Sequence, residues 1–349
     1  MISVVDRPAN KTKTGLLTAS FLFVCALLLS ACQPAEQTTR WQGGVMGTRY
    51  HIAITSDQPI AAGLEQQVAA LVAALDQRFT TYSDDSELMA LNRQPVGVPL
   101  AISAELYAVL AEAAEIYRLS GGAFDPTVGP LVELWGFGRS AASDQLPSDS
   151  AIATQLERVG FDGLALLEGQ RAVRLRPVQL DLSAIAKGYA VDAAADLLDA
   201  NALHDYMVEV GGELRLGGYN AEGSRWRIAL ESPLQFGQVE RVLAITDSAL
   251  ATSGDYHNYF TVAGVRYSHT IDPRTGRPVP RGLVSVTVLA ESSMRADAMA
   301  TAISVLGAKK GLALAEQLGL PVYLLNLRDG ALEAQSSSAF APYLAPIQD

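Results

Sequence analysis

Two oxygen-bearing side chains in a run of small residues are the first candidates for chemistry in this chain. The run is Ala296-Asp297-Ala298-Met299-Ala300-Thr301-Ala302, which is typical of a helix. Asp297 and Thr301 are four residues apart, so on a helix they share one face. A carboxylate with a hydroxyl suits Mg²⁺, which completes its shell with water and substrate phosphate. Taken alone, the pair fits a structural role better, with Asp297 near a helix start and Thr301 in a core contact.

A second candidate is the segment 181–189, with the sequence Asp-Leu-Ser-Ala-Ile-Ala-Lys-Gly-Tyr. We expect a strand to end at Asp181, Ser183 to cap the next helix, and Lys187 to fall in its first turn. Free N–H groups at such a helix start favour a phosphate, and Lys187 adds a positive charge. A capped surface helix with a solvated lysine explains the segment equally well, because capped helices are common.

Three turns carry further polar or aromatic residues, in segments 121–127, 252–257 and 268–276. Proline and glycine alone explain the first and last as structural turns. The middle one contains Asp255 and His257, and histidine is the side chain that titrates near neutral pH. A histidine is nevertheless more often structural than catalytic.

The motifs of several common enzyme classes are absent or out of context. Residues 136–141, Gly-Phe-Gly-Arg-Ser-Ala, formally fit the dinucleotide glycine fingerprint. They run into Ser-Asp-Gln-Leu-Pro rather than into a helix, so we interpret them as a loop. The chain has no HExxH, GxSxG or GxxxxGK(S/T) sequence, which removes the usual zinc-protease, hydrolase and P-loop interpretations.

The charge balance argues against nucleic acid as a partner. The formal net charge is −11, and no basic run follows Lys13, whereas phosphate backbones are bound by clustered Lys and Arg. A chain of 349 residues with 49% hydrophobic residues can bury a large core.

The N-terminus is typical of a lipoprotein signal peptide. Arg7, Lys11 and Lys13 precede an apolar stretch, residues 16–29, which ends in Leu-Ser-Ala-Cys. Cys32 is then the acylated first residue, and the mature chain keeps no free thiol. The alternative is a transmembrane helix, which needs about 20 apolar residues. The predicted domains are a signal peptide (1–31), a lipidated cysteine with a polar tether (32–40) and one compact body (41–349).

Hydrophobic periodicity predicts the elements that must position these side chains. Helices are expected at residues 64–79, 103–119, 184–200, 296–306 and 309–318, and strands at 49–55, 173–182, 206–210, 225–230, 241–246, 260–262, 284–289 and 322–326. Most strands neighbour other strands and the helices occur in blocks. This pattern indicates an α+β fold with largely antiparallel sheets rather than a doubly wound nucleotide fold.

Taken together, these segments resemble the ApbE family, the flavin transferases that attach FMN to proteins. Seven motifs follow in order over nearly the whole mature chain, and a lipoprotein signal is usual in such proteins. One departure is Ser183, where many members have Gly. The motifs are Met46-Gly47-Thr48, Thr81-Tyr82-Ser83, Gly122-Ala123-Phe124-Asp125-Pro126, the 181–189 segment, Ala251-Thr252-Ser253-Gly254-Asp255-Tyr256, residues 269–276 and residues 296–302.

The resemblance implies a two-lobed α+β fold with FAD between the lobes and Mg²⁺ held by Asp297, Thr301 and the backbone carbonyl of Ala184. It implies transfer of the FMN half of FAD to a Thr hydroxyl of a partner protein with release of AMP. Typical acceptors are subunits of sodium-pumping quinone reductases and Rnf-type complexes. The expected FAD contacts are Met46, Tyr82, Ala123, Phe124, Asp125, Asp181, Lys187 and Ile271.

The residue chemistry agrees with that activity. Mg²⁺ and Lys187 can neutralise the two phosphates. A Thr hydroxyl needs a base, for which His257 and Asp255 are candidates. The same site would serve an FAD pyrophosphatase that releases FMN and AMP, while a non-catalytic flavin-binding lipoprotein would need no metal pair. We expect a lipid-anchored protein on the periplasmic side of the inner membrane, with the outer membrane left open by Gln33.

Overall fold

The structure is a computed structural model that describes residues 37–139, 146–235, 237–254 and 259–344. Its helices are α2 (Leu64–Phe79), α3 (Glu87–Arg93), α4 (Ala104–Ser120), α5 (Gly129–Leu134), α6 (Asp149–Leu156), α7 (Ala186–Ala200) and α8 (Ser293–Leu318), with 3₁₀ turns η1 (Phe161–Gly163) and η2 (Ser338–Tyr343). Its strands are β1 (Gln37–Val45), β2 (Thr48–Ser56), β3 (Leu100–Ala101), β4 (Leu164–Leu167), β5 (Arg171–Arg174), β6 (Tyr206–Val210), β7 (Glu213–Gly217), β8 (Trp226–Glu231), β9 (Val239–Ile245), β10 (Ser248–Gly254), β11 (Tyr259–Val262), β12 (Val265–Ser268), β13 (Ile271–Asp272), β14 (Arg277–Pro278), β15 (Leu283–Ala290), β16 (Val322–Arg328) and β17 (Ala331–Ser336).

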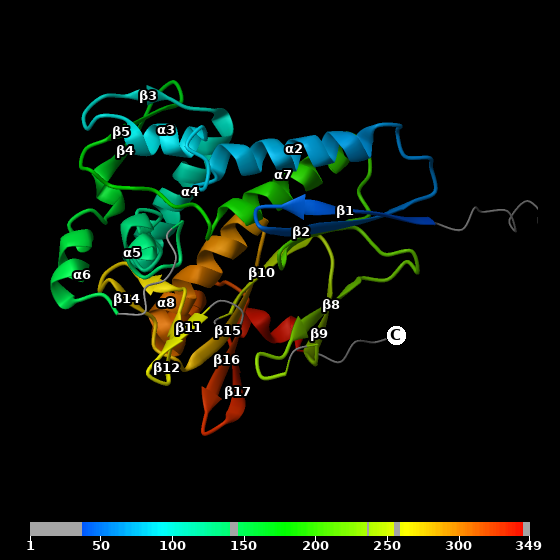
Figure 1. Cartoon of the computed structure of the whole chain (residues 1–349). Helices are drawn as coiled ribbons and strands as arrows, with labels where there is room; N and C mark the ends of the chain where they lie inside the picture. Colours follow the sequence, from blue (N-terminus) through cyan, green and yellow to red (C-terminus); the bar gives the residue numbers. More distant parts are fainter. Residues whose placement is uncertain (1–36, 140–145, 236, 255–258, 345–349) are drawn as a thin grey trace, which may run out of the picture.

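An eight-stranded sheet in the order β1-β2-β6-β7-β10-β15-β16-β17 organises the molecule. Every neighbouring pair in it is antiparallel. Helices α2, α7 and α8 contact one face, while the β8–β9 hairpin and η2 pack on the other (Figure 1). The predicted antiparallel α+β fold is therefore confirmed.

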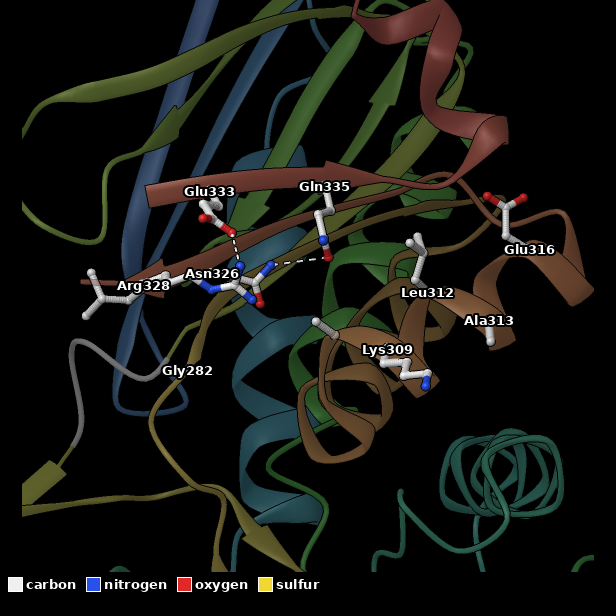
Figure 2. Close-up of a pocket in the computed structure, with 11 residues that line it drawn as sticks. Gly282, Lys309, Leu312, Ala313, Glu316, Asn326, Arg328, Glu333 and Gln335 are labelled. Atoms are coloured by element: carbon white, nitrogen blue, oxygen red, sulfur yellow. Dashed lines mark hydrogen bonds and ion pairs between the residues drawn. The ribbon is translucent and has the colours of Figure 1, made fainter. Parts of the chain in front are cut away.

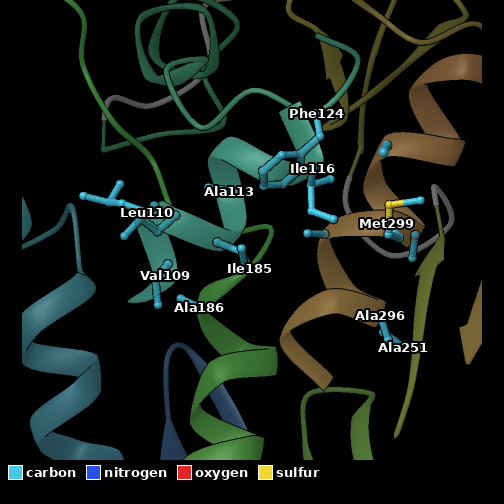
Figure 3. Close-up of a cluster of buried hydrophobic side chains, with 14 of the residues drawn as sticks. Val109, Leu110, Ala113, Ile116, Phe124, Ile185, Ala186, Ala251, Ala296 and Met299 are labelled. Carbon is cyan, nitrogen blue, oxygen red and sulfur yellow. The ribbon is translucent and has the colours of Figure 1, made fainter. Parts of the chain in front are cut away.

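The main core lies between α4, α7, α8 and the helix-covered face of the sheet (Figure 3). Ala296, Met299 and Ile303 of α8 are fully buried in it. Helix α8 is long and apolar enough to cross a membrane, but its packing in this core identifies it as a central helix of the fold. Gly307 has a non-helical conformation (φ 74°) and divides α8 where the sequence predicted two helices.

Smaller units flank this layer. Strands β3, β5 and β4 form a three-stranded sheet near α4. Helices α5 and α6 pack around Leu131, Trp135 and Ile152, together with Ile271 of β13.

Several predicted elements have different limits. The expected strand 173–182 ends at Arg174, and the following residues are irregular. Strand β10 covers 248–254, part of which was interpreted as a turn, and β7 was not predicted. Strand β1 begins at Gln37, so the last residues of the expected tether belong to the sheet.

Candidate functional site

Helices α7 and α8 cross at their N-termini, and this crossing is the scaffold of the candidate site. A Cβ at Gly188 would overlap the backbone of Ser293 and lie 2.6 Å from Met294 Cα, so only glycine permits this approach. Asp192 of α7 accepts hydrogen bonds from the backbone N–H groups of Ser293 (2.9 Å) and Met294 (2.8 Å). The carboxylate satisfies N–H groups that have no partner within the helix, and its negative charge is stabilised by the positive end of the α8 dipole. Residues of both helices are thereby held in a fixed relation.

Lys187 and Asp297 meet at this crossing. Lys187 Nζ lies 3.7 Å from Asp297 Oδ2, and the N–H of Gly188 donates to the same oxygen at 3.2 Å. The Lys187 Nζ also donates to the carbonyl oxygen of Ser183 at 3.3 Å. Asp297 is 3% exposed. The two segments that the sequence suggested separately therefore form one buried ionic site.

A second carboxylate, Glu213, completes the site and was missed by the sequence reasoning. Its Oε1 lies 3.3 Å from Lys187 Nζ, the residue is 4% exposed, and Oε2 has no hydrogen-bond partner. Glu213 opens β7 after the two-residue turn Gly211-Gly212, whose φ angles of 60° and 105° suit glycine. The alternation Glu213, Leu214, Arg215, Leu216 was the available signal, since it places charged residues on the helix-covered face.

Burial and mutual attraction shift the titration of these groups. Burial raises the pKa of Glu213 to about 8, with Lys187 opposing and Asp297 adding to the rise. Burial likewise raises the pKa of Asp297 against the pull of Lys187. Burial disfavours the Lys187 ammonium, but Asp297 and Glu213 outweigh it and raise the pKa of Lys187. Lys187 is therefore a permanent cation at neutral pH.

The expected metal ligands lie beside this ionic site. Thr301 follows Asp297 by one turn of α8, and its Oγ1 lies 3.4 Å from Ser253 Oγ of β10. Ala184 lies in the turn before α7. Asp297, Thr301 and a carbonyl are hard-oxygen donors, and Glu213 Oε2 adds a buried unpartnered oxygen. This chemistry fits a small divalent cation such as Mg²⁺, although the described residues contain no group of three or more His, Cys, Asp or Glu suited to a metal.

The start of α7 differs from the predicted capped helix. The helix begins at Ala186 with Ile185 at its N-cap, and Ser183 does not cap it. Instead, Asp181 Oδ1 accepts hydrogen bonds from Ser183 N (2.9 Å) and Oγ (2.6 Å). This local turn competes with capping, as is typical of Asp and Ser.

The segment 123–125 lies next to Asp181, because the N–H of Asp181 donates to the carbonyl of Pro126 at 2.7 Å. Ala123 and Phe124 are buried, with Phe124 in the main core. Asp125 accepts from Thr127 N (2.8 Å), Thr127 Oγ1 (2.6 Å) and Phe161 N (3.2 Å). Burial raises the pKa of Asp125 to about 6, although these hydrogen bonds oppose it.

Met46 occupies the β1–β2 turn with a positive φ of 48°, and its N–H donates to Asp76 Oδ2 at 2.8 Å. That turn is near Lys187, because a Cβ at Gly211 would touch both Thr48 and the Lys187 stem. The structure thus brings Met46 toward the ionic site.

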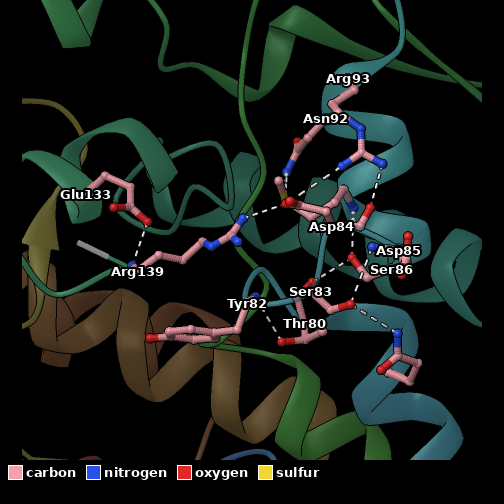
Figure 4. A network of polar contacts seen from close by, with 12 residues as sticks. Thr80, Tyr82, Ser83, Asp84, Asp85, Ser86, Asn92, Arg93, Glu133 and Arg139 are labelled. Atoms are coloured by element: carbon pink, nitrogen blue, oxygen red, sulfur yellow. Dashed lines mark hydrogen bonds and ion pairs between the residues drawn. The ribbon is translucent and has the colours of Figure 1, made fainter.

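Tyr82 lies in the loop between α2 and α3, and Ile271 opens β13. Tyr82 is 66% exposed, and its ring extends away from Ser83 and Asp84 (Figure 4). Ile271 is buried beside Leu131 and Trp135. Asp255, His257 and Cys32 lie outside the described residues.

A surface cavity of about 680 Å³ lies elsewhere, between the second half of α8 and β16–β17 (Figure 2). Lys309, Glu316 and Asn326 are among its lining residues, and none of the predicted site residues borders it.

The fold and the site define a mixed helix and strand protein in which a lysine, two buried carboxylates and a hydroxyl converge where two helices cross. The chain belongs to the ApbE family, whose model matches residues 46–324. The FAD:protein FMN transferase of Vibrio cholerae is 40% identical over 322 residues, which cover 91% of this chain and 96% of the relative.

Solved structures agree with this membership. The flavin transferase ApbE from Vibrio cholerae is 40% identical with a TM-score of 0.83, covering 88% of this chain and 100% of that one. The flavinyl transferase ApbE of Pseudomonas stutzeri, in its apo form, is 35% identical with a TM-score of 0.81, covering 89% and 98%.

Proposed function

We propose that this protein is a Mg²⁺-dependent FAD:protein FMN transferase that attaches FMN to a Thr hydroxyl of an acceptor protein and releases AMP. The observation that carries the proposal is the placement of Lys187 between Asp297 and Glu213 at the crossing of α7 and α8. The family membership and the names of relatives covering over nine-tenths of the chain support the same activity.

Asp297, Thr301 and the carbonyl of Ala184 would hold the Mg²⁺ ion. When bound, the ion would offset charge on the diphosphate of FAD. The buried position of Asp297 favours this use, because a carboxylate that already has a low-dielectric environment attracts a cation strongly.

Lys187 supplies the second positive charge. Its ammonium lies at the start of α7, near the Met46 turn and the carbonyl of Ser183. We assign it to the diphosphate, where it offsets charge on the departing AMP phosphate. Met46, Tyr82, Ala123, Phe124, Asp125, Asp181 and Ile271 are the proposed flavin and adenine contacts. Because Phe124 is buried in the core, its backbone rather than its ring would face the ligand.

The acceptor Thr requires a base, since a hydroxyl is a weak nucleophile. His257 is the proposed base and Asp255 its alternative, because both follow β10, which carries Ser253 beside Thr301. The acceptor proteins proposed are subunits of quinone reductases or Rnf-type complexes. Cys32 is proposed to anchor the protein to the periplasmic side of the inner membrane.

The test is incubation of the protein with FAD, Mg²⁺ and a candidate acceptor, followed by mass measurement of the acceptor. The proposal expects an acceptor heavier by one FMN, with AMP released in equal amount. A parallel reaction without acceptor separates the alternatives, because rapid AMP release there would identify a pyrophosphatase. An unmodified acceptor together with intact FAD would contradict both activities.

A further inference from the structure

Lys187 stands where it competes with any cation for Asp297. Its Nζ lies 3.7 Å from Asp297 Oδ2, and Asp297 is almost fully buried. A divalent ion on that carboxylate would meet an ammonium at close range, and like charges repel strongly away from bulk water. The Lys187 ammonium must therefore shift away from Asp297 when a cation binds.

Among the described residues, Lys187 forms ion pairs with Asp297 and Glu213 only, so Glu213 is the alternative partner for a Lys187 that leaves Asp297. Its Oε1 already lies 3.3 Å from Nζ, while Oε2 is buried and has no hydrogen-bond partner. An ammonium has three donors, and a carboxylate can accept several hydrogen bonds. Glu213 therefore has the unused capacity to receive a second hydrogen bond from a displaced Lys187.

The local structure fixes Glu213 and leaves Lys187 free to adjust. Glu213 begins β7, pairs with Val210 of β6, and follows the tight Gly211-Gly212 turn. The Lys187 stem passes beside Gly211, where a Cβ would lie 3.4 Å from Lys187 Cδ. The long lysine side chain can thus swing over a small residue toward a carboxylate held by the sheet.

We propose that Glu213 is a positioning residue. When a divalent cation occupies Asp297, the displaced Lys187 ammonium moves to Glu213, which accepts its hydrogen bonds. In this way Lys187 keeps its charge beside the site without opposing the metal. The inference rests on the proposed function, because the cation is the Mg²⁺ of that function.

The experiment measures Mn²⁺ binding to the FAD-free protein by the loss of the electron paramagnetic resonance signal of free Mn²⁺. Four proteins are compared: wild type, Glu213→Gln, Lys187→Met and the double variant. Glu115→Gln is the matched control, since Glu115 pairs with Arg118 on the surface of α4 and is not among the proposed site residues.

We expect Glu213→Gln to bind Mn²⁺ roughly 10- to 100-fold more weakly, the range typical of residues that support metal ligands. Lys187→Met should bind Mn²⁺ more tightly than wild type, because the competitor is gone. The double variant should bind like Lys187→Met, because Glu213 acts through Lys187. Glu115→Gln should match wild type. Excess Mg²⁺ should restore most of the transfer rate of Glu213→Gln, a recovery that a folding defect would not allow.

Two results would overturn the inference alone: equal Mn²⁺ affinity in wild type and Glu213→Gln, or an equal loss from Glu213→Gln with and without Lys187. The latter would make Glu213 a direct ligand. No Mn²⁺ binding by wild type would overturn the metal site of the proposed function together with the inference.

Discussion

Three titratable side chains, one basic and two acidic, determine what the candidate site can do. The Lys187 ammonium lies between the carboxylates of Asp297 and Glu213, and both carboxylates are buried. Because buried charges are stable only when paired, removing one member changes the state of the other two. Substitutions here are therefore informative when the variant keeps the size of the side chain.

Asp297 is the residue on which metal-dependent transfer should depend most. We expect Asp297→Asn and Asp297→Ala to abolish FMN transfer while FAD still binds, because the other proposed contacts remain. Thr301→Ala should mainly raise the Mg²⁺ concentration required, since a neutral hydroxyl is the weaker ligand. Transfer rates and FAD affinity measured separately test this. Full transfer by Asp297→Ala in excess chelator would contradict the site.

Asp125 should make the stability of the protein depend on pH. Its folded-state pKa is about 6, above the ordinary value of 3.8, because burial disfavours the carboxylate. The folded protein then holds this proton more tightly than the unfolded chain. The resulting stabilisation is full below pH 3.8 and is lost as the pH rises through about 6.

Asp125→Asn, which cannot titrate, isolates this effect. The difference in unfolding free energy, wild type minus Asp125→Asn, should fall by at most about 3 kcal/mol across that pH window, at about 1.36 kcal/mol per pKa unit. Urea unfolding of both proteins at several pH values measures it. A difference that stays constant with pH would contradict the raised pKa.

At the scale of elements, the site depends on how closely α7 and α8 approach. Lys187 lies on one helix and Asp297 on the other, so their separation sets the distance between ammonium and carboxylate. Asp192 also joins the helices, and burial raises its pKa to about 6 against the hydrogen bonds from Met294 and Ser293. Gly188 of α7 allows the approach, because it has no Cβ to overlap the backbone of Ser293 and Met294.

Gly188→Ala should force this crossing apart. The new methyl group would overlap the backbone of Ser293, and a backbone cannot move aside as a flexible side chain can. We expect a loss of about 1–3 kcal/mol in the free energy of unfolding, the usual cost of overpacking, and a larger proportional loss of transfer activity.

Gly282→Ala is the matched control, because a Cβ at Gly282 would have nothing within 4 Å and its φ is not left-handed. It should change stability by less than about 0.5 kcal/mol. Denaturant unfolding and the transfer assay compare the two variants. Equal stability of both would show that the α7–α8 contact tolerates a side chain.

At the scale of the whole molecule, one antiparallel sheet joins segments that are far apart in the chain. Strand β2 pairs with β6 and β7 with β10, so residues near positions 50, 210 and 250 lie side by side (Figure 1). The helix-covered face of this sheet carries the site, and the β8–β9 hairpin packs on the opposite face. The proposed membrane anchor precedes this body in the chain.

Cys32→Ala should release the protein from the membrane. A lipid chain on Cys32 would be the anchor, because α8 belongs to the folded core. Cell fractionation followed by detection of the protein in soluble and membrane fractions tests this. Unchanged membrane retention of Cys32→Ala would contradict a lipid anchor at this position.

Local patterns were enough to predict several elements and one half of the site. Hydrophobic periodicity predicted helices at residues 64–79 and 103–119, and these correspond to α2 and α4 as observed. The Asp297 and Thr301 pair lies on a helix, as its spacing indicated. These features depend on neighbours three or four residues away, so the sequence contains them directly.

Only the tertiary structure decided the rest, because the relevant partners are distant in sequence. Strand β10 ends in Thr-Ser-Gly, which favours a turn locally, yet β15 pairs along its length and β7 along its first residues. Glu213 resembles a surface glutamate in sequence, but the β6–β7 pairing turns it under α7, where Lys187 is its partner. Long-range pairing thus determines which polar residues are buried, and burial determines their chemistry.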